Sequence, residues 1–414
     1  MSQYKPLRVV DMAAQLGGNS SNFSTLGILI VQRIAESPRF RIPFFEFMEL
    51  ALYHPLHGYY ASSASQIGTR GDFFTSPHLG ADFGELLAEQ FVQMWEVMGQ
   101  PHPFLLVEMG AGQGLLASDI LGYVQKSYPS FFESLEYLII ERAAALMVEQ
   151  RRQLKPLEMM GNRLRWCRFE DLPAESITGC FFSNELVDAL PVHQVILETG
   201  QLREVYVTVQ PEAEAEVPFV EVVGDLSTPY LVKYFDQVGI NLFSGAYPNG
   251  YRTEVNLAAL DWMTTVAEKL KRGYVLTIDY GYTSDRYYHP MRSQGTLQCY
   301  YRHRHHSNPY IYVGEQDITA HVDFTALQRQ GERWGLRTLG FTKQGMFLMA
   351  LGLGDRLAAL SQSETSDPQA IVEILRRRDA LQQLVNPVGL GNFGVLIQGK
   401  GVENNEPLKG LRQE

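Results

Sequence analysis

The stretch FLLVEMGAGQGLLASDIL, residues 104–121, decides the fold of this 414-residue chain. An apolar run of strand length leads into a turn that contains Gly110, Gly112 and Gly114, and a helix is expected from Leu115. Glycines let the backbone reverse sharply and approach a ligand closely, and a helix N-terminus offers unpaired N–H groups. The stretch predicts a strand, a tight turn and a helix. A ligand-free packed connection would need the same glycines, so the turn alone indicates only a nucleotide-like ligand.

Further short apolar runs, each bounded by turn residues, follow at intervals of helix length. Runs of this kind are typical of buried parallel strands that are joined by crossover helices. The expected fold class is therefore α/β, with a doubly wound, Rossmann-like sheet. The runs are YLIIE (137–141), LRWCRF (164–169), GCFFSN (179–184) and GYVLTIDYG (273–281).

The remaining segments predict additions to this sheet. Helix-period apolar residues in 24–52 and 83–95 indicate an N-terminal helical region. The interval between Val192 and Leu270 is too long for one crossover, and two alternating runs around Thr199-Gly200 predict a hairpin within a large insertion after the fourth strand. Residues 210–218 are expected to form an exposed loop. The expected segments are 1–100, 101–192, 193–270 and 271–414.

Acidic residues at successive strand ends distinguish between nucleotide-like ligands. The third glycine comes one position too early for the G-x-G-x-x-G dinucleotide pattern, and Glu108 directly precedes the turn. A carboxylate there would repel a pyrophosphate but suits the ammonium and sulfonium of S-adenosylmethionine. Glu141 ends the next strand, where a carboxylate meets ribose hydroxyls, and Glu170 and Asp171 would accept from the adenine amino group. Each charge alone would also suit a solvated strand end, but their order favours S-adenosylmethionine over a nicotinamide dinucleotide.

The segment SNELVDALP, residues 183–191, follows the fourth strand, where a transferable group would meet its acceptor. Asn184 and Glu185 would orient a nitrogen acceptor, and Asp188 would brace the loop as a helix N-terminal cap. These three residues are the candidate catalytic group.

Composition excludes several classes of protein. A net charge of −11 argues against a nucleic-acid binder, and it is compatible with a basic protein substrate as well as with solubility alone. Three scattered cysteines make a zinc knuckle or a disulfide scaffold improbable, so a cytoplasm-like compartment is expected. No secretory or transit pattern and no apolar run of about 18 residues is present, so membrane insertion is not expected.

The run RHRHH (302–306) lacks neighbouring carboxylates and predicts a solvated loop, so no metal site is expected.

Several motifs in order along the chain resemble the MidA-type protein arginine methyltransferases. This family includes the mitochondrial complex I assembly factor that dimethylates an arginine symmetrically on a core subunit of that complex. The resemblance covers nearly the whole chain. It rests on residues 45–60, 71–90, 107–121, 139–150, 183–194, 276–281, 317–324 and 386–401.

The resemblance implies a class I methyltransferase sheet, with N-terminal helices and a large insertion that covers the site. It implies that a loop from Gly71 to Thr75 folds over the cofactor, and that Asn184 and Glu185 form the catalytic pair. The residues expected to bind S-adenosylmethionine are Gly71, Asp72, Phe74, Thr75, Glu108, Gly110, Ala111, Gly112, Gly114, Glu141, Glu170 and Asp171. Ala111 and Gln113 stand where the family usually has Pro and Arg. Alanine keeps the turn compact, whereas the loss of the Arg puts in question how the loop is held in place or how a partner is recognised.

An arginine acceptor would enter as a charged guanidinium and would need carboxylates around it. Glu185 is expected to hold it by charge-assisted hydrogen bonds, with Asp188 and Asp279 adding negative potential. His321 and Asp323 are expected in a loop that faces the acceptor, although His321 would serve equally well as a structural histidine.

The function expected is methylation, with symmetric dimethylation, of an arginine on a protein such as a complex I-type subunit. The alternatives are a small-molecule methyltransferase and an assembly chaperone that binds S-adenosylmethionine without turnover. A nicotinamide oxidoreductase is a more distant alternative.

Overall fold

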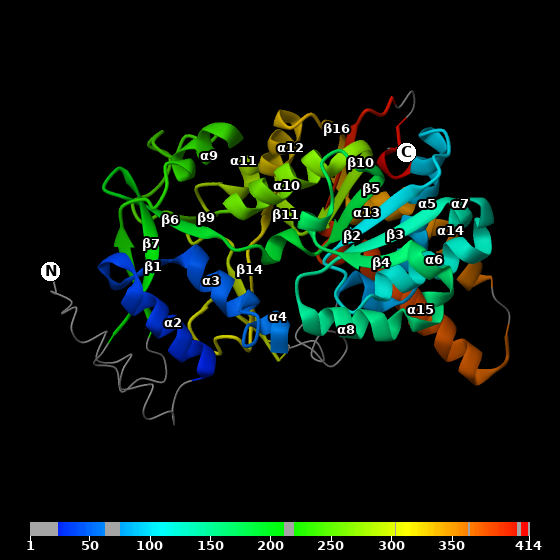
Figure 1. Cartoon of the computed structure of the whole chain (residues 1–414), viewed down its shortest axis with the longest axis horizontal. Helices are drawn as coiled ribbons and strands as arrows, with labels where there is room; N and C mark the ends of the chain where they lie inside the picture. The colour runs from blue at the N-terminus through cyan, green and yellow to red at the C-terminus, as the bar shows by residue number, and fades with distance from the viewer. Residues whose placement is uncertain are drawn as a thin grey trace. The chain divides into compact units, whose positions relative to one another are not determined.

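The computed structural model describes residues 24–62, 75–210, 219–302, 304–362, 365–403 and 407–412, apart from the side chains of residues 158–160. The chain divides into two compact units, each made of three segments (Figure 1). Unit 1 comprises Met1–Gln66, Ala189–Leu260 and Thr283–Ala326, and unit 2 comprises Ile67–Asp188, Asp261–Tyr282 and Leu327–Glu414. The expected four-segment division stays a prediction.

Unit 2 is built on a seven-stranded sheet with the order β16-β17-β10-β5-β2-β3-β4. The five strands from β10 to β4 are parallel to one another, while β17 runs antiparallel to both β10 and β16. The strands are β2 (Phe104–Met109), β3 (Leu135–Ile140), β4 (Leu164–Cys167), β5 (Ile177–Asn184), β10 (Leu270–Asp279), β16 (Arg337–Lys343) and β17 (Gly394–Lys400).

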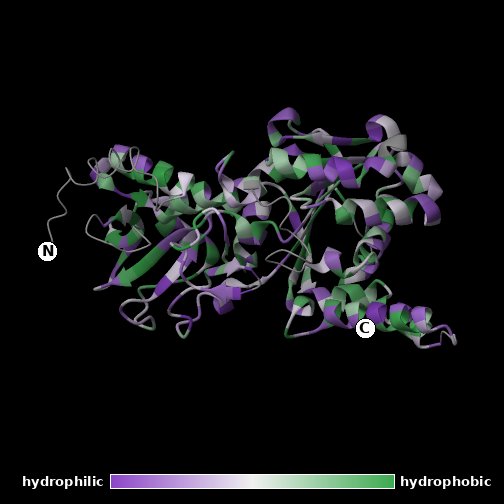
Figure 2. Ribbon diagram, turned by 90° about the horizontal axis from the view of Figure 1, so that it is seen from below, coloured by the Kyte–Doolittle hydropathy of each residue, from purple (hydrophilic) through white to green (hydrophobic). Residues whose placement is uncertain are grey.

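The central strands form because both of their faces are covered. Every residue of β2 is buried, as is every residue of β5 except Thr178 and Asn184, so an uninterrupted apolar run is more stable here than an alternating one. One face packs with helices α5, α6, α13 and α15 in a single hydrophobic core. Most helices carry both hydrophilic and hydrophobic residues, as expected of elements that cover a sheet (Figure 2).

The helices of unit 2 follow the crossover pattern between the parallel strands. They are α5 (Asp82–Val97), α6 (Leu115–Ser127), α7 (Pro129–Ser134), α8 (Ala144–Gln153), α13 (Gln344–Ala350), α14 (Leu353–Ser361) and α15 (Pro368–Val385). Two further helices, α10 (Leu257–Lys269) and α12 (Phe324–Arg333), run from a segment of unit 1 into the following segment of unit 2.

Unit 1 contains a five-stranded antiparallel sheet in which β1, β7, β6 and β9 are neighbours in that order and β8 pairs with β7. Helices α2 and α3 pack on it through a second core. Its helices and main strands are α2 (Thr25–Glu36), β1 (Ile42–Pro43), α3 (Phe44–Tyr53), α4 (Tyr59–Ser62), β6 (His193–Glu198), β7 (Gln201–Val209), β8 (Phe219–Gly224), α9 (Tyr230–Val238), β9 (Arg252–Val255) and α11 (Ser284–Tyr287). Short strands complete the list: β11 (Gly281–Tyr282, in unit 2), β12 (Gln298–Tyr301), β13 (Arg304–His306), β14 (Asp317–Thr319) and β15 (Val322–Asp323).

The doubly wound α/β sheet predicted from the apolar runs is confirmed, and the hairpin expected around Thr199-Gly200 is β6 and β7. The loop expected at 302–306 is wrong for Arg304–His306, which pairs with β12 as strand β13, while the side chains of Arg304 and His305 are exposed as expected. Residues 211–218 of the expected exposed loop lie outside the described residues. Within the described ranges, no helix is both long and apolar enough to cross a membrane.

Candidate functional site

The topology of unit 2 places four candidate segments at the carboxyl ends of the parallel strands, on one side of the sheet. The strand order reverses between β2 and β5, and in open α/β sheets ligands bind at the carboxyl ends of the strands beside such a reversal. The glycine turn follows β2, Glu141 follows β3, the Asn184-Glu185 pair follows β5, and Asp279 ends β10.

The glycine turn adopts a backbone that other residues rarely tolerate. Gly110, Gly112 and Gly114 have φ angles of 73°, 53° and 81°, all in the left-handed region. A Cβ on Gly110 would lie 2.7 Å from Cδ1 of Leu186, so the turn also packs closely on the loop after β5. Gly114 is the N-cap of α6 and donates to the carbonyl of Ala111 at 2.8 Å. The turn is thus compact, and it leads directly into the positive end of α6.

Glu108 lies buried just before this turn. Its side chain is 3% exposed, and the hydroxyl of Tyr137 donates to its Oε2 at 2.8 Å. Burial, with the nearby carboxylate of Glu141, raises the pKa of Glu108 to about 7 although the Tyr137 hydrogen bond opposes the shift. A cation bound beside Glu108 would restore its charge.

Glu141 is held by its own turn and by the following helix. The N–H of Ala143 donates to Oε1 at 2.8 Å, and the amide of Gln150 donates to Oε2 at 3.0 Å. Burial raises the pKa of Glu141, while these hydrogen bonds and the positive charge of Arg142 lower it. Its carboxylate is therefore oriented before any ligand arrives.

These groups fit S-adenosylmethionine. Two buried carboxylates stand beside a glycine turn at a helix N-terminus, and this donor set matches an ammonium, a sulfonium and ribose hydroxyls better than a pyrophosphate. Glu108 would meet the ammonium, and Glu141 would meet the ribose.

The other expected cofactor residues are placed less favourably or not described. Glu170 and Asp171 lie in the short helix η4 (Phe169–Asp171), where both are exposed and Asp171 accepts from the N–H of Arg168 at 2.8 Å. Their role at the adenine stays a prediction. Gly71, Asp72 and Phe74 lie outside the described residues.

Thr75 is described, and its hydroxyl lies 2.7 Å from Nδ1 of His78. His78 lies in the short helix η2 (Ser76–Leu79), and it also hydrogen-bonds Gln113. Gln113, which stands where the family usually has Arg, thereby joins the glycine turn to the segment after the expected cofactor loop.

Asn184 and Glu185 stand together at the end of β5. Asn184 Nδ2 donates to Glu185 Oε1 at 3.0 Å, and the N–H of Ser76 donates to the same oxygen at 3.4 Å. Asn184 Oδ1 is buried and has no hydrogen-bond partner among the described residues. Burial and the charge of Asp188 raise the pKa of Glu185 to about 8 against the opposing hydrogen bonds from Asn184 and Ser76.

The loop-bracing role expected of Asp188 belongs to Asp279. The Oδ2 of Asp279 accepts from the N–H groups of Val187 and Asp188 at 2.9 and 3.3 Å, whereas Asp188 itself lies inside the short helix η5 (Val187–Ala189) rather than at its N-cap. The reason is geometric, because β10 is the parallel neighbour of β5, and the fully buried carboxylate at its end meets the N–H groups that begin this short helix. Burial, Asp188 and Glu185 raise the pKa of Asp279 well above its usual range.

His321 and Asp323 belong to unit 1, whereas the other candidates belong to unit 2. Asp323 is buried and accepts from the hydroxyls of Ser284 and Tyr234 at 2.8 and 3.0 Å. Burial lowers the pKa of His321 to about 4, so its ring is neutral at pH 7. Their substrate role stays a prediction.

Sequence reasoning missed Gln150, Tyr137 and Ser76. Gln150 and Leu146 are the two buried residues of α8, at i and i+4, so a polar residue on the buried stripe of that helix was the available signal. Ser76 and Tyr137 gave no such signal, because their partners Glu185 and Glu108 are distant in sequence.

In the described part of the chain, no group of three or more His, Cys, Asp or Glu residues is arranged to hold a metal ion.

The fold and this site define a class I S-adenosylmethionine-dependent methyltransferase. A family model described as "Putative S-adenosyl-L-methionine-dependent methyltransferase" matches residues 86–342, and the chain belongs to this family. A Burkholderia thailandensis protein described as a "likely methyl transferase" and solved bound to S-adenosyl-homocysteine is similar in structure. The TM-score is 0.80 and the identity 30%, over 100% of this chain and 97% of that one. S-adenosylmethionine, the cofactor, supplies a methyl group on a sulfonium.

Two curated relatives carry a more specific name. The Drosophila melanogaster "Protein arginine methyltransferase NDUFAF7 homolog, mitochondrial" is 29% identical over 87% of this chain and 82% of its own length. The Rattus norvegicus "Protein arginine methyltransferase NDUFAF7, mitochondrial" is 30% identical over 84% of this chain and 78% of its own length.

The names of these relatives contradict the expected cytoplasmic location, since both include the word mitochondrial. The expectation rested on scattered cysteines and on the pattern of the first residues. Unpaired thiols indicate a reducing environment, which does not identify one compartment.

Proposed function

We propose that this methyltransferase acts on an arginine side chain of a protein, with Glu185 as the residue that holds the guanidinium. The observation that carries the proposal is that two acceptors lie side by side. Asn184 Nδ2 donates to the Glu185 carboxyl, and Asn184 Oδ1 is a buried acceptor that has no partner within the described residues. A guanidinium offers N–H donors in a planar fork and matches two adjacent acceptors. The names of the relatives support the same acceptor.

The charge of the site supports a cationic acceptor. Burial and repulsion by the charge of Asp188 raise the pKa values of Glu185 and Asp279. Moving a positive charge beside Glu185 would stabilise the ionised carboxylate, so substrate binding would release a proton near neutral pH. Binding and orientation of the guanidinium would then direct one nitrogen at the methyl group.

We further propose that the product is symmetric dimethylarginine and that the substrate is a complex I-type subunit. Both follow from the resemblance to the MidA-type family, and both can be read from one experiment. Extract from a strain that lacks this gene is incubated with the purified protein and methyl-labelled S-adenosylmethionine. The labelled proteins are then hydrolysed and identified by mass spectrometry.

Glu185→Gln tests the assignment. This variant should bind S-adenosylhomocysteine as the wild type does, and its methyl transfer should fall by about 100-fold or more, because the charged partner of the guanidinium is lost. Glu175→Gln is a matched control, since Glu175 is an exposed glutamate of the same unit with a similar φ of 51°. The control should retain full activity.

Unchanged methyl transfer in Glu185→Gln would contradict the role of Glu185. Label on a small molecule, or on residues other than arginine, would contradict the proposed acceptor. Loss of methylation in Glu185→Gln with undisturbed assembly of the partner complex would favour a chaperone function.

A further inference from the structure

Gln150 connects three parts of the cofactor site. It lies near the end of α8, it is 0% exposed, and its amide nitrogen donates to the carbonyl of Gly112 at 2.9 Å and to Glu141 Oε2 at 3.0 Å. Its amide oxygen accepts from Nε1 of Trp166 at 2.9 Å. One side chain therefore contacts the turn after β2, the carboxylate after β3 and a residue of β4.

Only a primary amide fits this position. The two N–H donors of Gln150 meet two acceptors, and its oxygen meets one donor. Both N–H groups and the carbonyl of the amide therefore have hydrogen-bond partners. A glutamate would place a carboxylate against Glu141 and against a carbonyl, and an apolar residue would leave one buried and two partly buried polar groups without this partner. Close packing adds to the constraint, because a Cβ on Gly114 would lie 3.5 Å from Cα of Gln150.

We propose that Gln150 is a positioning residue for the cofactor, which fixes the glycine turn and the Glu141 carboxylate relative to each other. This inference rests on the proposed contact of Glu141 with the ribose. The Ala143 N–H fixes one oxygen of Glu141, and Gln150 fixes the other and so sets the rotation of the carboxylate plane. Gln150 touches neither cofactor nor substrate in this role, and it acts through Glu141 and Gly112.

The test is a double-mutant cycle read by the affinity for S-adenosylhomocysteine, measured by calorimetry. Gln150→Met keeps the volume and removes all three hydrogen bonds, and it should weaken binding on the order of tenfold. Glu141→Gln should weaken binding as well. Because the part of the effect of Gln150 that runs through Glu141 is already lost in Glu141→Gln, the double variant should lose clearly less affinity than the sum of the two single losses.

Two further variants control for folding. Gln153→Met makes the same substitution at an exposed position of the same helix and should leave affinity unchanged. Gln150→Glu keeps the acceptor for Trp166 but loses both donors, so it should weaken binding at least as much as Gln150→Met. Each variant is first compared with the wild type by thermal unfolding, so that loss of fold is separated from loss of affinity.

The pH profile of binding distinguishes positioning from a general loss of packing. The charged groups around Glu141 are Glu108 and Arg142, and Gln150 lowers the pKa of Glu141. In Gln150→Met the pH at which affinity falls should therefore move upward, whereas packing damage would leave that midpoint in place. An unmoved midpoint, or additive losses in the cycle, would overturn the proposal. If Glu141→Gln binds S-adenosylhomocysteine as tightly as the wild type, the proposed contact of Glu141 with the ribose is itself contradicted.

Discussion

Glu185 has a φ of 52°, in the left-handed region that residues other than glycine rarely adopt. Its N–H donates to the carbonyl of Ile278 at 2.9 Å, so β10 holds the turn in this conformation. Strain of this kind persists only where the surroundings impose it, and it collects at functional sites. The direction of the Glu185 side chain is thus set by the backbone of two neighbouring strands.

Gly110→Ala is expected to disturb the cofactor site more than the fold. The new methyl group would meet Leu186 in a backbone with a φ of 73°, so S-adenosylhomocysteine affinity should fall by about tenfold or more, and stability by about 1–2 kcal/mol. Gly99→Ala is the control, because Gly99 has a φ of 80° but open space around its Cβ position. It should lower stability by about 1 kcal/mol and leave affinity unchanged, as calorimetry and thermal unfolding would show. Equal affinities for the two variants would contradict the close packing of the turn on Leu186.

At this scale the sequence predicted the identity of the important residues better than their geometry. Glu108, Glu141 and Glu185 follow apolar runs, so their positions at strand ends were predictable. The positive φ of Glu185 was not, since nothing local favours it. Gln150 was missed because its two acceptors and its one donor lie in three separate segments of the chain.

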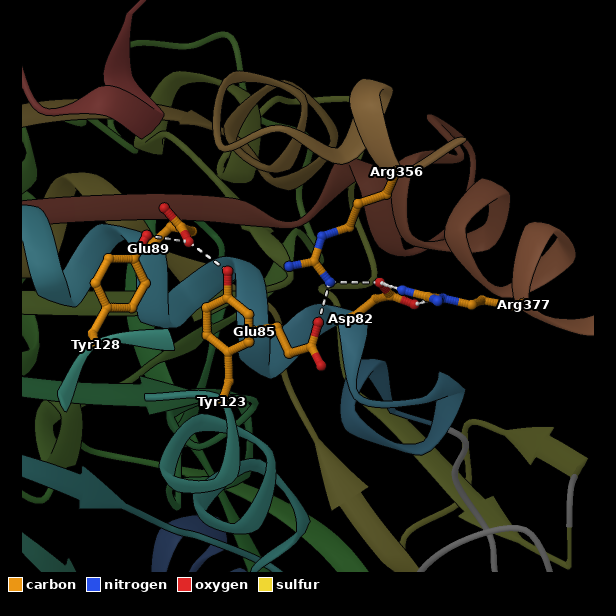
Figure 3. A network of polar contacts seen from close by, with 7 residues as sticks. All are labelled: Asp82, Glu85, Glu89, Tyr123, Tyr128, Arg356 and Arg377. Carbon is orange, nitrogen blue, oxygen red and sulfur yellow. Dashed lines mark hydrogen bonds and ion pairs between the residues drawn. The ribbon is translucent and has the colours of Figure 1, made fainter. Parts of the chain in front are cut away.

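Helix α5 is joined to the C-terminal helices by ion pairs (Figure 3). Asp82 accepts from Arg377 of α15 at 2.7 Å and from Arg356 of α14 at 2.6 Å, and Arg356 also pairs with Glu85. Desolvation of Asp82 opposes ionisation, but the two arginines prevail and lower its pKa. Figure 3 also shows Glu89, one helical turn further along, accepting from the hydroxyls of Tyr123 and Tyr128. These contacts order helices that are remote in sequence.

Asp119 of α6 packs against Gly84 of α5, and its pKa is shifted in the opposite direction. Burial, with the charges of Glu85 and Asp82, raises the pKa of Asp119 to about 7. A raised pKa means that the folded state binds more protons than the unfolded one. The stability that Asp119 contributes is therefore complete below about pH 4 and is lost as the pH rises through 7.

Asp119→Asn should consequently stabilise the protein more at pH 8 than at pH 6. The difference between the two pH values should be about 1 kcal/mol in the free energy of unfolding, or a few degrees in Tm. Thermal unfolding at the two pH values measures this. Asp379→Asn, at an exposed position of α15, should show no such difference. A gain of equal size at both pH values would mean that packing, and not charge, explains the effect.

The elements themselves were predictable to different degrees. The parallel strands have apolar runs because both faces are buried, so sequence pattern was sufficient. The antiparallel pair β16 and β17 was not predicted, because every residue of β16 after Arg337 is only partly buried and β17 reads like another parallel strand. Pairing direction depends on chain connection, which periodicity does not encode.

At the scale of the whole molecule, all four tryptophans belong to unit 2. They are Trp95, Trp166, Trp262 and Trp334, and no segment of unit 1 contains one. Tryptophan fluorescence therefore reports on unit 2 alone. The interleaving of three segments in each unit could not be predicted from the sequence, since a local pattern does not reveal which distant segments pack together.

S-adenosylhomocysteine should raise the midpoint of unfolding followed by tryptophan fluorescence. At about 100 times the Kd, the ligand should stabilise the unit by about 2.7 kcal/mol, because it binds the folded state. S-adenosylhomocysteine should also change the emission of Trp166, which hydrogen-bonds Gln150 beside Glu141. A midpoint that is insensitive to the ligand would contradict the placement of the cofactor site in unit 2, and NAD serves as the control ligand.

The position of β17 between β10 and β16 has a consequence for synthesis. Strand β17 ends at Lys400, yet it occupies an inner position of the sheet. While the ribosome is still translating the residues before β17, the edge of β10 has no neighbour on that side and offers free backbone groups to any other strand. The side of β10, the strand that carries Asp279, therefore stays unpaired until residues 394–400 have been synthesised, because β17 is the last strand of this sheet in sequence order.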